Sequence, residues 1–163
     1  MRLAGKVKMG YYPTPPEVAT TIGKLLKLSE KGKSYLLLDP CCGCGTALKI
    51  IAEELIKKSP PDKKVITYGI ELDEQRFFKA KQTLRQVLLA DAITEVMVSN
   101  KTFSLLFLNP PYDWQKTETE FEHRRIEMEF LTTYTEKLRP GGLLVFLCAV
   151  SFFNYKNLSY LLE

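Results

Sequence analysis

Short apolar runs recur along the chain and are separated by longer segments of mixed character. Four of the runs cover residues 35–38, 65–70, 104–108 and 143–148. Each is bounded by polar or glycine residues, a pattern typical of buried strands in a parallel sheet. A shorter apolar stretch directly before Asp91 predicts one more strand, so we expect five.

The segments between these runs carry apolar residues at intervals of three and four, as the buried face of a helix does. They predict helices over 47–57, 74–88 and 125–138. The proline-broken stretch 57–64 and the polar stretch 113–123 predict loops. Strands that alternate with helices indicate an α/β, doubly wound fold with a mostly parallel sheet and right-handed crossovers.

The length of 163 residues fits one domain. Hydrophobic residues make up 45% and charged residues 26% of the chain, which is ordinary for a globular protein. We find no apolar span of about 20 residues and no apolar core near the N-terminus, so we expect neither a membrane helix nor a secretory signal, and hence a cytoplasmic protein. The net charge of +4 permits contact with nucleic acid without demonstrating it.

The cysteines predict neither a disulfide nor a metal site. Cys41, Cys42 and Cys44 are too close together to bridge easily, and Cys148 lies far downstream. Their spacing is not that of a zinc site, and His123 is the single histidine of the sequence. We interpret the cysteines as small, reduced, buried residues.

The first predicted strand leads into a glycine-containing loop. Gly43 and Gly45 allow a ligand to approach the backbone closely, and the helix that follows points its amide groups at the same place. Asp39 at the end of the strand would repel a diphosphate but suits a sulfonium or amino group. The loop therefore favours a cationic ligand, and Asp39 and the missing third glycine disfavour a nicotinamide dehydrogenase.

Acidic residues also follow the second and third strands. Glu71 is placed to accept both ribose hydroxyls of a nucleoside, whereas Asp73 reads as a helix N-cap. Asp91 is either an ordinary loop residue or an acceptor for the amino group of an adenine. The apolar neighbours available to flank such a ring are Leu72, Ala92 and Ile93.

The most specific motif, Asn109-Pro110-Pro111-Tyr112, comes directly after the strand at 104–108. Two prolines fix the backbone there and end the strand. The Asn109 side-chain oxygen and the Pro110 carbonyl oxygen could accept the two hydrogens of an amine, and Tyr112 offers a flat face to a planar substrate.

With these motifs in this order, the chain resembles the class I S-adenosylmethionine-dependent methyltransferases, in particular the amino methyltransferases that modify adenine in DNA. The segment 12–19 (YPTPPEVA) is similar to the additional cofactor motif of those enzymes, and Thr14 is the expected N-cap of the helix that begins near Pro15. The resemblance implies one catalytic domain, with residues 1–34 as an N-terminal cofactor motif and helix and 35–163 as a Rossmann-like core.

The resemblance also implies the site. The expected catalytic residues are Asn109, Pro110, Pro111 and Tyr112. The expected S-adenosylmethionine-binding residues are Tyr12, Thr14, Pro15, Asp39, Pro40, Cys41, Gly43, Gly45, Glu71, Leu72, Asp91, Ala92 and Asn109. The implied reaction is direct methyl transfer to an adenine flipped out of duplex DNA, without a metal or a covalent intermediate.

The sequence departs from the family after the fifth strand, where the last strands of the sheet and a target-recognition region are expected but not seen. This predicts an exposed sheet edge at 143–148 that needs a missing C-terminal region or a partner. Trp114, Arg124 and Arg125 could meet a nucleotide or phosphates, or could belong to a solvated loop.

Other functions stay open at this point. The same tetrapeptide serves methyltransferases that act on an RNA base or on a protein glutamine amide, and a non-catalytic cofactor-binding module would keep the same loop. The upstream segment 12–19 favours adenine in DNA. The target sequence and the role, whether in restriction-modification, in regulation or in defence against mobile elements, are not predicted.

Overall fold

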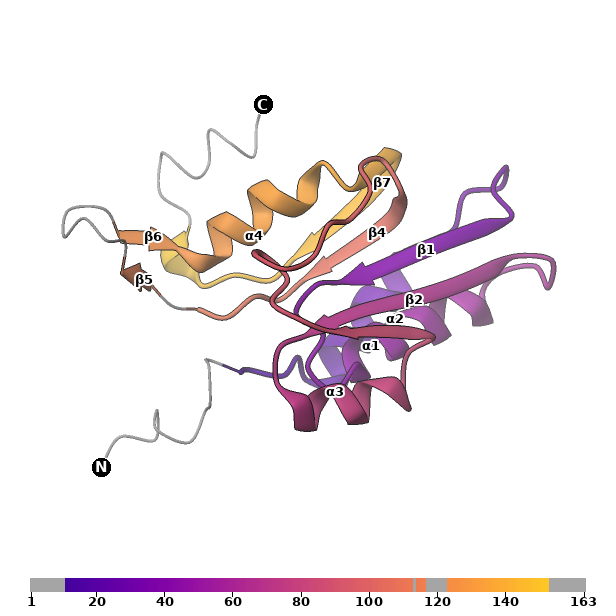
Figure 1. The fold of residues 1–163 in the computed structure, drawn as a ribbon. Helices are drawn as coiled ribbons and strands as arrows, with labels where there is room; N and C mark the ends of the chain where they lie inside the picture. The colour runs from indigo at the N-terminus through magenta and orange to yellow at the C-terminus, as the bar shows by residue number, and fades with distance from the viewer. Residues whose placement is uncertain (1–10, 113, 117–122, 153–163) are drawn as a thin grey trace.

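The computed structural model describes residues 11–112, 114–116 and 123–152. Its centre is a five-stranded sheet of order β3-β2-β1-β4-β7 (Figure 1). All four neighbouring pairs are parallel, which confirms the predicted doubly wound α/β fold. The strands are β1 (Ser34–Asp39), β2 (Lys64–Glu71), β3 (Gln86–Leu89), β4 (Phe103–Leu108) and β7 (Leu138–Phe146).

Helices cover both faces of this sheet, and the two faces build separate cores. The helices are α1 (Pro16–Leu25), α2 (Thr46–Lys57), α3 (Glu74–Lys81) and α4 (Ile126–Thr135). Side chains alternate along a strand, so Leu37 of β1 belongs to the core that includes residues of α1, α2 and α3, whereas its neighbour Leu38 belongs to the core that includes residues of α4. Figure 1 shows α4 on one side of the sheet and the other three helices on the opposite side.

The order of strands reverses beside β1, because the chain adds β2 and β3 on one side and β4 and β7 on the other. In open parallel sheets of this kind, ligands bind at the carboxyl ends of the strands at such a reversal. The carboxyl ends of β1 and β4 carry Asp39 and, one residue beyond the strand, Asn109. The fold therefore brings the two predicted motifs to one place.

The predicted helix over 74–88 is too long. Helix α3 ends at Lys81, and residues 86–89 form β3, with Tyr68 opposite Gln86 and Glu71 opposite Leu89. The Arg85 N–H donates to the Thr67 hydroxyl at 3.0 Å and helps to return the chain to the sheet. Pairing with β2 therefore prevails over the helical spacing of apolar residues in this segment.

The predicted boundary between the last helix and the last strand is also wrong. Helix α4 ends at Thr135, and β7 begins at Leu138, five residues earlier than expected, and ends at Phe146. The register of β7 against β4 shifts between Phe103 and Leu105, and Gly141 has a φ of +75°. Gly141 and Gly142 therefore lie within the strand, at an irregularity in its pairing, and do not precede it. As predicted, β7 lies at an edge, and among the described residues no further strand joins this sheet.

The segment expected to be a loop over 113–123 contains two short antiparallel strands. Trp114–Lys116 (β5) pairs with His123–Arg125 (β6), and Trp114 lies opposite Arg125. Residues 113 and 117–122 lie outside the described part. The Arg125 side chain is 14% exposed and bonds Ser151 at 2.7 Å, so it is engaged within the protein rather than held out toward phosphates.

Within the described residues, no helix has the length and apolar character needed to cross a membrane. In the same part of the chain, no group of three or more histidine, cysteine, aspartate or glutamate side chains is arranged to hold a metal ion. All four cysteines are free thiols, but the prediction that they are buried holds for Cys42 alone, since the other three are partly exposed.

Candidate active site

A cavity of about 550 Å³ opens at the carboxyl ends of the strands. The predicted site residues that line it are Tyr12, Thr14, Asp39, Pro40, Cys41, Glu71, Leu72, Asp91, Ala92, Asn109 and Pro111. The predicted residues Pro15, Gly43, Gly45, Pro110 and Tyr112 are not part of its lining. Residues from six segments of the chain thus meet around one space, which is of the size of a small-molecule site.

The Asn109 side chain has a fixed orientation. Its Nδ2 donates to the Tyr12 carbonyl oxygen at 2.9 Å and to the Thr14 hydroxyl at 3.0 Å. Both amide hydrogens are used in this way, so Oδ1 must point elsewhere, and it accepts from the Tyr112 hydroxyl at 2.8 Å. The upstream segment thereby turns the Asn109 acceptor toward Tyr112.

This contact corrects the prediction for Thr14. The N-cap of α1 is Pro15, and no side chain caps the helix. Thr14 instead uses its hydroxyl to hold Asn109, because the two segments, 95 residues apart in sequence, meet at the carboxyl end of β4. Asp73, in contrast, is the predicted N-cap of α3 and accepts from the Arg76 N–H at 2.9 Å.

Two tyrosines flank this corner of the site. The rings of Tyr12 and Tyr112 are stacked, with centroids 6.0 Å apart and planes at 29°. Burial raises the pKa of the Tyr112 hydroxyl, and nearby Cys148 and Glu127 add to the effect. The phenol is therefore neutral near pH 7 and keeps the proton that it donates to Asn109.

The glycine loop packs tightly enough to need both glycines. Gly43 and Gly45 have φ angles of +56° and +78°. A Cβ atom on Gly43 would lie 2.4 Å from the Tyr11 ring, and one on Gly45 would lie 2.8 Å from Leu84. Any larger residue would strain the backbone and move side chains that hold the loop in place.

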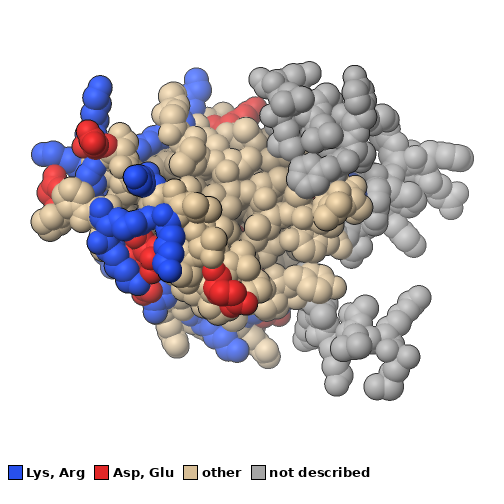
Figure 2. Space-filling model, turned by 180° about the vertical axis from the view of Figure 1, so that it is seen from behind, with Lys and Arg blue, Asp and Glu red and all other residues tan. Residues whose placement is uncertain are grey.

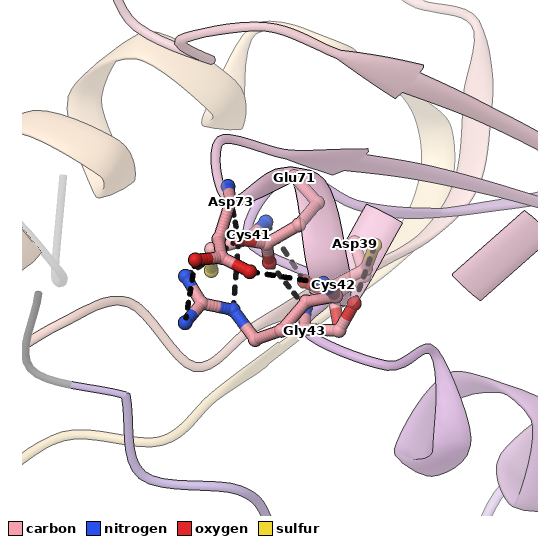
Figure 3. Close-up of polar contacts among 7 residues, drawn as sticks. Asp39, Cys41, Cys42, Gly43, Glu71 and Asp73 are labelled. Atoms are coloured by element: carbon pink, nitrogen blue, oxygen red, sulfur yellow. Dashed lines mark hydrogen bonds and ion pairs between the residues drawn. The ribbon is translucent and has the colours of Figure 1, made fainter. Parts of the chain in front are cut away.

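Glu71 is buried and its carboxylate organises the loop (Figure 3). Oε2 accepts from the Gly43 N–H at 2.8 Å. Oε1 accepts from the Asp73 N–H at 2.8 Å and from two nitrogens of Arg76 at 3.0 and 2.7 Å. Arg76 in turn lies over the Tyr11 ring at 4.7 Å.

The two carboxylate oxygens of Glu71 differ in how many further hydrogen bonds they can accept. Oε1 already accepts three hydrogen bonds, whereas Oε2 accepts one and has capacity for another. A ligand hydroxyl could bind at Oε2 without displacing Arg76, but acceptance of two hydroxyls at once, as the sequence suggested, would require Arg76 to move.

We expect Glu71→Gln to weaken cofactor binding about tenfold or more, because a charged acceptor is replaced by a neutral one that no longer pairs with Arg76. Calorimetry with S-adenosylhomocysteine measures this. Glu71→Ala is less informative, because it removes the carboxylate that pairs with the mostly buried guanidinium of Arg76. Glu53→Gln, on an exposed helix face, is the control; equal affinity in both variants would remove Glu71 from the cofactor site.

Asp39 lies on the floor of the cavity and is 2% exposed. Its Oδ1 accepts from the Cys41 N–H at 3.0 Å. Burial, which outweighs this hydrogen bond, and to a lesser extent the Glu71 charge raise its pKa to about 7. A cationic ligand beside Asp39 would favour the carboxylate form.

Asp91 uses one oxygen for its own loop. Oδ1 accepts from the N–H groups of Ile93 at 2.8 Å and Thr94 at 3.2 Å, which fixes the turn after β3. Its backbone N–H donates to Glu95 at 2.7 Å. The turn places Ala92 and Ile93 at the cavity.

The cysteines of the loop are not activated. Burial raises the pKa of Cys41 well above its ordinary value, and nearby Asp39 adds to the effect. Cys42 behaves in the same way. Both are neutral thiols near pH 7, which suits the predicted packing role and not that of a nucleophile.

Several residues that line the cavity were not predicted from the sequence, among them Tyr11, Thr46, Arg76, Ile126, Glu129 and Phe130. Arg76 could have been predicted, because it lies in the first turn of the helix after Glu71, from where its side chain can reach back to the end of the strand. For the three residues of α4, the sequence showed only the spacing of one helix face, which does not indicate a ligand site.

The positive charges of the described chain do not gather at this cavity. Figure 2 shows that, on one face, Lys and Arg side chains cluster at one end and leave the middle of the face largely uncharged. The connections that precede β1 and β2 are rich in lysine, and they lie at the amino ends of the strands, opposite the cavity. The net charge therefore does not single out the site.

Comparison with known families decides the class of protein. A sequence model of the Uncharacterised methyltransferase family (DUF6094) matches residues 1–156. The chain belongs to this methyltransferase family. No protein with a curated functional description matches it in sequence.

Solved structures share the fold of this methyltransferase-family chain. A Listeria monocytogenes protein assigned to the class I S-adenosylmethionine-dependent methyltransferases superposes with a TM-score of 0.75 at 21% identity, over 97% of this chain and 54% of its own. The methyltransferase subunit of a type I restriction-modification system from Streptococcus thermophilus gives 0.63 at 18%, over 84% and 34%. The type IIG restriction endonuclease BpuSI gives 0.67 at 14%, over 93% and 21%. The chain thus spans about half the length of the first of these structures, and less of the others.

The cofactor of this methyltransferase fold is S-adenosylmethionine. The cavity fits it, because its volume of about 550 Å³ lies in the range of such ligand sites. The buried Asp39 can face the positive charge of the ligand, and Glu71 Oε2 can accept from a ligand hydroxyl. When bound, the cofactor supplies an electrophilic methyl group.

Proposed function

We propose that the protein transfers a methyl group from S-adenosylmethionine to the exocyclic amine of adenine in DNA, and that residues 1–163 act as one catalytic domain. The observation that carries the proposal is the orientation of Asn109. Its amide hydrogens are held by Tyr12 and Thr14, and its oxygen, which accepts from the Tyr112 hydroxyl, has capacity to accept from an incoming amine as well.

In this reaction the Asn109 oxygen and the Pro110 carbonyl oxygen accept the two hydrogens of the amine and aim its lone pair at the methyl group. The bond from sulfur to the methyl carbon breaks as the bond from nitrogen forms, and one proton then leaves the nitrogen for water. The two acceptors stabilise positive charge that develops on nitrogen, an electrostatic effect aimed at the transition state. No group on the enzyme needs to become covalently attached.

DNA is the proposed substrate for two reasons. The upstream segment 12–19 resembles a motif of the DNA adenine enzymes, and Tyr12 and Thr14 of this segment accept hydrogen bonds from Asn109. Two of the structures that share the fold are a methyltransferase subunit of a restriction-modification system and a restriction endonuclease. For β7, whose Leu143 is 50% exposed, we propose a cover from a further region or partner subunit.

The test is to incubate the protein with methyl-labelled S-adenosylmethionine and, separately, with duplex DNA, structured RNA and a protein extract. We expect label in DNA. Label in RNA or in glutamine would keep the chemistry at Asn109 and replace the substrate, and label in none of the three would contradict the proposed activity.

Tyr112 gives a sharper test of how the base is held. We expect Tyr112→Ala to lower kcat/KM about 10- to 100-fold, since stacking of a base on an aromatic ring contributes about 1–3 kcal/mol. Tyr112→Phe keeps the ring and frees the Asn109 oxygen, so its activity should stay within a few fold of the parent. Equal losses in both variants would show that the hydroxyl, and not the ring, is needed.

A further inference from the structure

One face of α4 forms a wall of the cofactor cavity. Ile126, Glu129 and Phe130 follow one another at helical spacing, so they lie on the same side of the helix, and all three line the cavity. One turn farther on, the Tyr134 hydroxyl donates to the Ala92 carbonyl oxygen at 2.7 Å. This bond holds α4 against the turn after β3 that carries Asp91.

Glu129 differs from the other acids of the cavity in its hydrogen bonding. Asp39, Glu71 and Asp91 all accept backbone N–H groups. Glu129 Oε2 is buried and, among the described residues, no side chain or backbone group donates to it. A buried oxygen of this kind is costly unless a donor satisfies it, which points to a donor supplied by a ligand of the cavity.

The position of Glu129 indicates which part of a ligand supplies that donor. The turn at 91–94 brings apolar side chains to the cavity beside α4, and Asp91 Oδ1 is already committed to the N–H groups of Ile93 and Thr94. An amino group on an aromatic ring has two hydrogens, and one carboxylate oxygen at the turn does not satisfy both.

We propose that Glu129 accepts a hydrogen bond from the 6-amino group of the cofactor's adenine, opposite Asp91, and so makes the cavity selective for a 6-amino purine over a 6-oxo purine. This role rests on the adenine lying beside Asp91 and not on the identity of the methyl acceptor. It is therefore tested by binding, without substrate.

The experiment measures, by calorimetry, the dissociation constants of S-adenosylhomocysteine and of its 6-oxo analogue, S-inosylhomocysteine. The parent protein should prefer the adenine ligand about 10- to 100-fold, because the oxo group would face carboxylate oxygens. Glu129→Gln should lower this preference several-fold, since the glutamine amide can donate to the oxo group, whereas Asp91 still favours the amino group. Both ligands are measured on the same preparation, so a loss of folded protein does not alter the ratio.

Glu53→Gln, which removes the same charge from an exposed helix face, should leave the preference unchanged. A Glu129→Gln protein that discriminates as well as the parent would overturn the role of Glu129 alone. A parent protein that binds both ligands equally would overturn it as well, and one that binds neither would overturn the cofactor site on which it rests. Failure of methyl transfer to DNA would leave this result untouched.

Discussion

Replacing Asn109 by alanine is expected to lower kcat for methyl transfer by about 10²- to 10³-fold, the loss typical when one electrostatic acceptor or donor is removed from a transition state. Asn109 lines the cavity, and its oxygen is the proposed acceptor for the amine. A single-turnover assay at saturating cofactor measures the chemical step.

The structure adds a second, smaller effect. Asn109 Nδ2 also holds Tyr12 and Thr14, which line the cofactor cavity, so the alanine variant should bind cofactor a few fold more weakly instead of normally. Thr14→Val separates the two effects, because it removes the hydroxyl that accepts from Asn109 and leaves the Asn109 oxygen in place. We expect it to weaken cofactor binding and to keep kcat within about tenfold. If Thr14→Val were as inactive as Asn109→Ala, the loss of activity would come from the lost hydrogen bond between residues 14 and 109 and not from the lost Asn109 oxygen.

Asp39→Asn is expected to have two opposite effects at neutral pH, namely weaker cofactor binding by tenfold or more and a more stable protein. The binding loss follows from removing a buried charge that faces a cationic ligand. The gain in stability follows because the buried carboxylate is costly without its ligand, whereas asparagine keeps an acceptor for the Cys41 N–H.

The sign of the pH dependence follows from the raised pKa. Asp39 has a pKa of about 7 in the folded chain and an ordinary value of 3.8 when unfolded, so between these values the folded state holds the extra proton. The free energy of unfolding attributable to this group therefore falls as pH rises from about 4 to about 7, and it stays low above pH 7. With about 1.4 kcal/mol for each pKa unit, the loss is on the order of 4 kcal/mol.

Urea unfolding of the parent and of Asp39→Asn at pH 5 and pH 8 measures this contribution as the difference between the two proteins. The variant should be more stable than the parent at pH 8, and this advantage should shrink at pH 5. A difference that does not change with pH would show that Asp39 titrates normally.

Short-range patterns sufficed for the strands that form the centre of the sheet. The runs around 35–38, 65–70 and 104–108 are buried on both sides, and continuous apolar character marks such strands well. At β3 the apolar stretch before Asp91 indicated a strand, but the helical spacing also indicated a helix as far as residue 88, and Leu88 and Leu89 are about half exposed. There the strand exists because β2 offers a free edge, which a local window does not contain.

The same distinction applies to the site. That Asn109, Asp39 and Glu71 lie together at one cavity was predictable, because each stands at the end of a strand, where ligands bind to parallel sheets. The partners of these residues were not, because Thr14 and Asn109 meet across 95 positions and Glu129 reaches the cavity only after α4 docks on the turn at Ala92. Such contacts depend on how the helices and strands pack together, which cannot be predicted from the spacing or the type of the residues.

The most direct test of the central claim is to identify the atom that receives the methyl group. DNA labelled by the protein with methyl-labelled S-adenosylmethionine would be digested to nucleosides and separated beside standards, with Asn109→Ala as the parallel control. We predict label in N6-methyldeoxyadenosine, and little or none with the variant. Label in 5-methyldeoxycytidine, where carbon and not an amine is methylated, or equal labelling by the Asn109→Ala protein, would contradict the account.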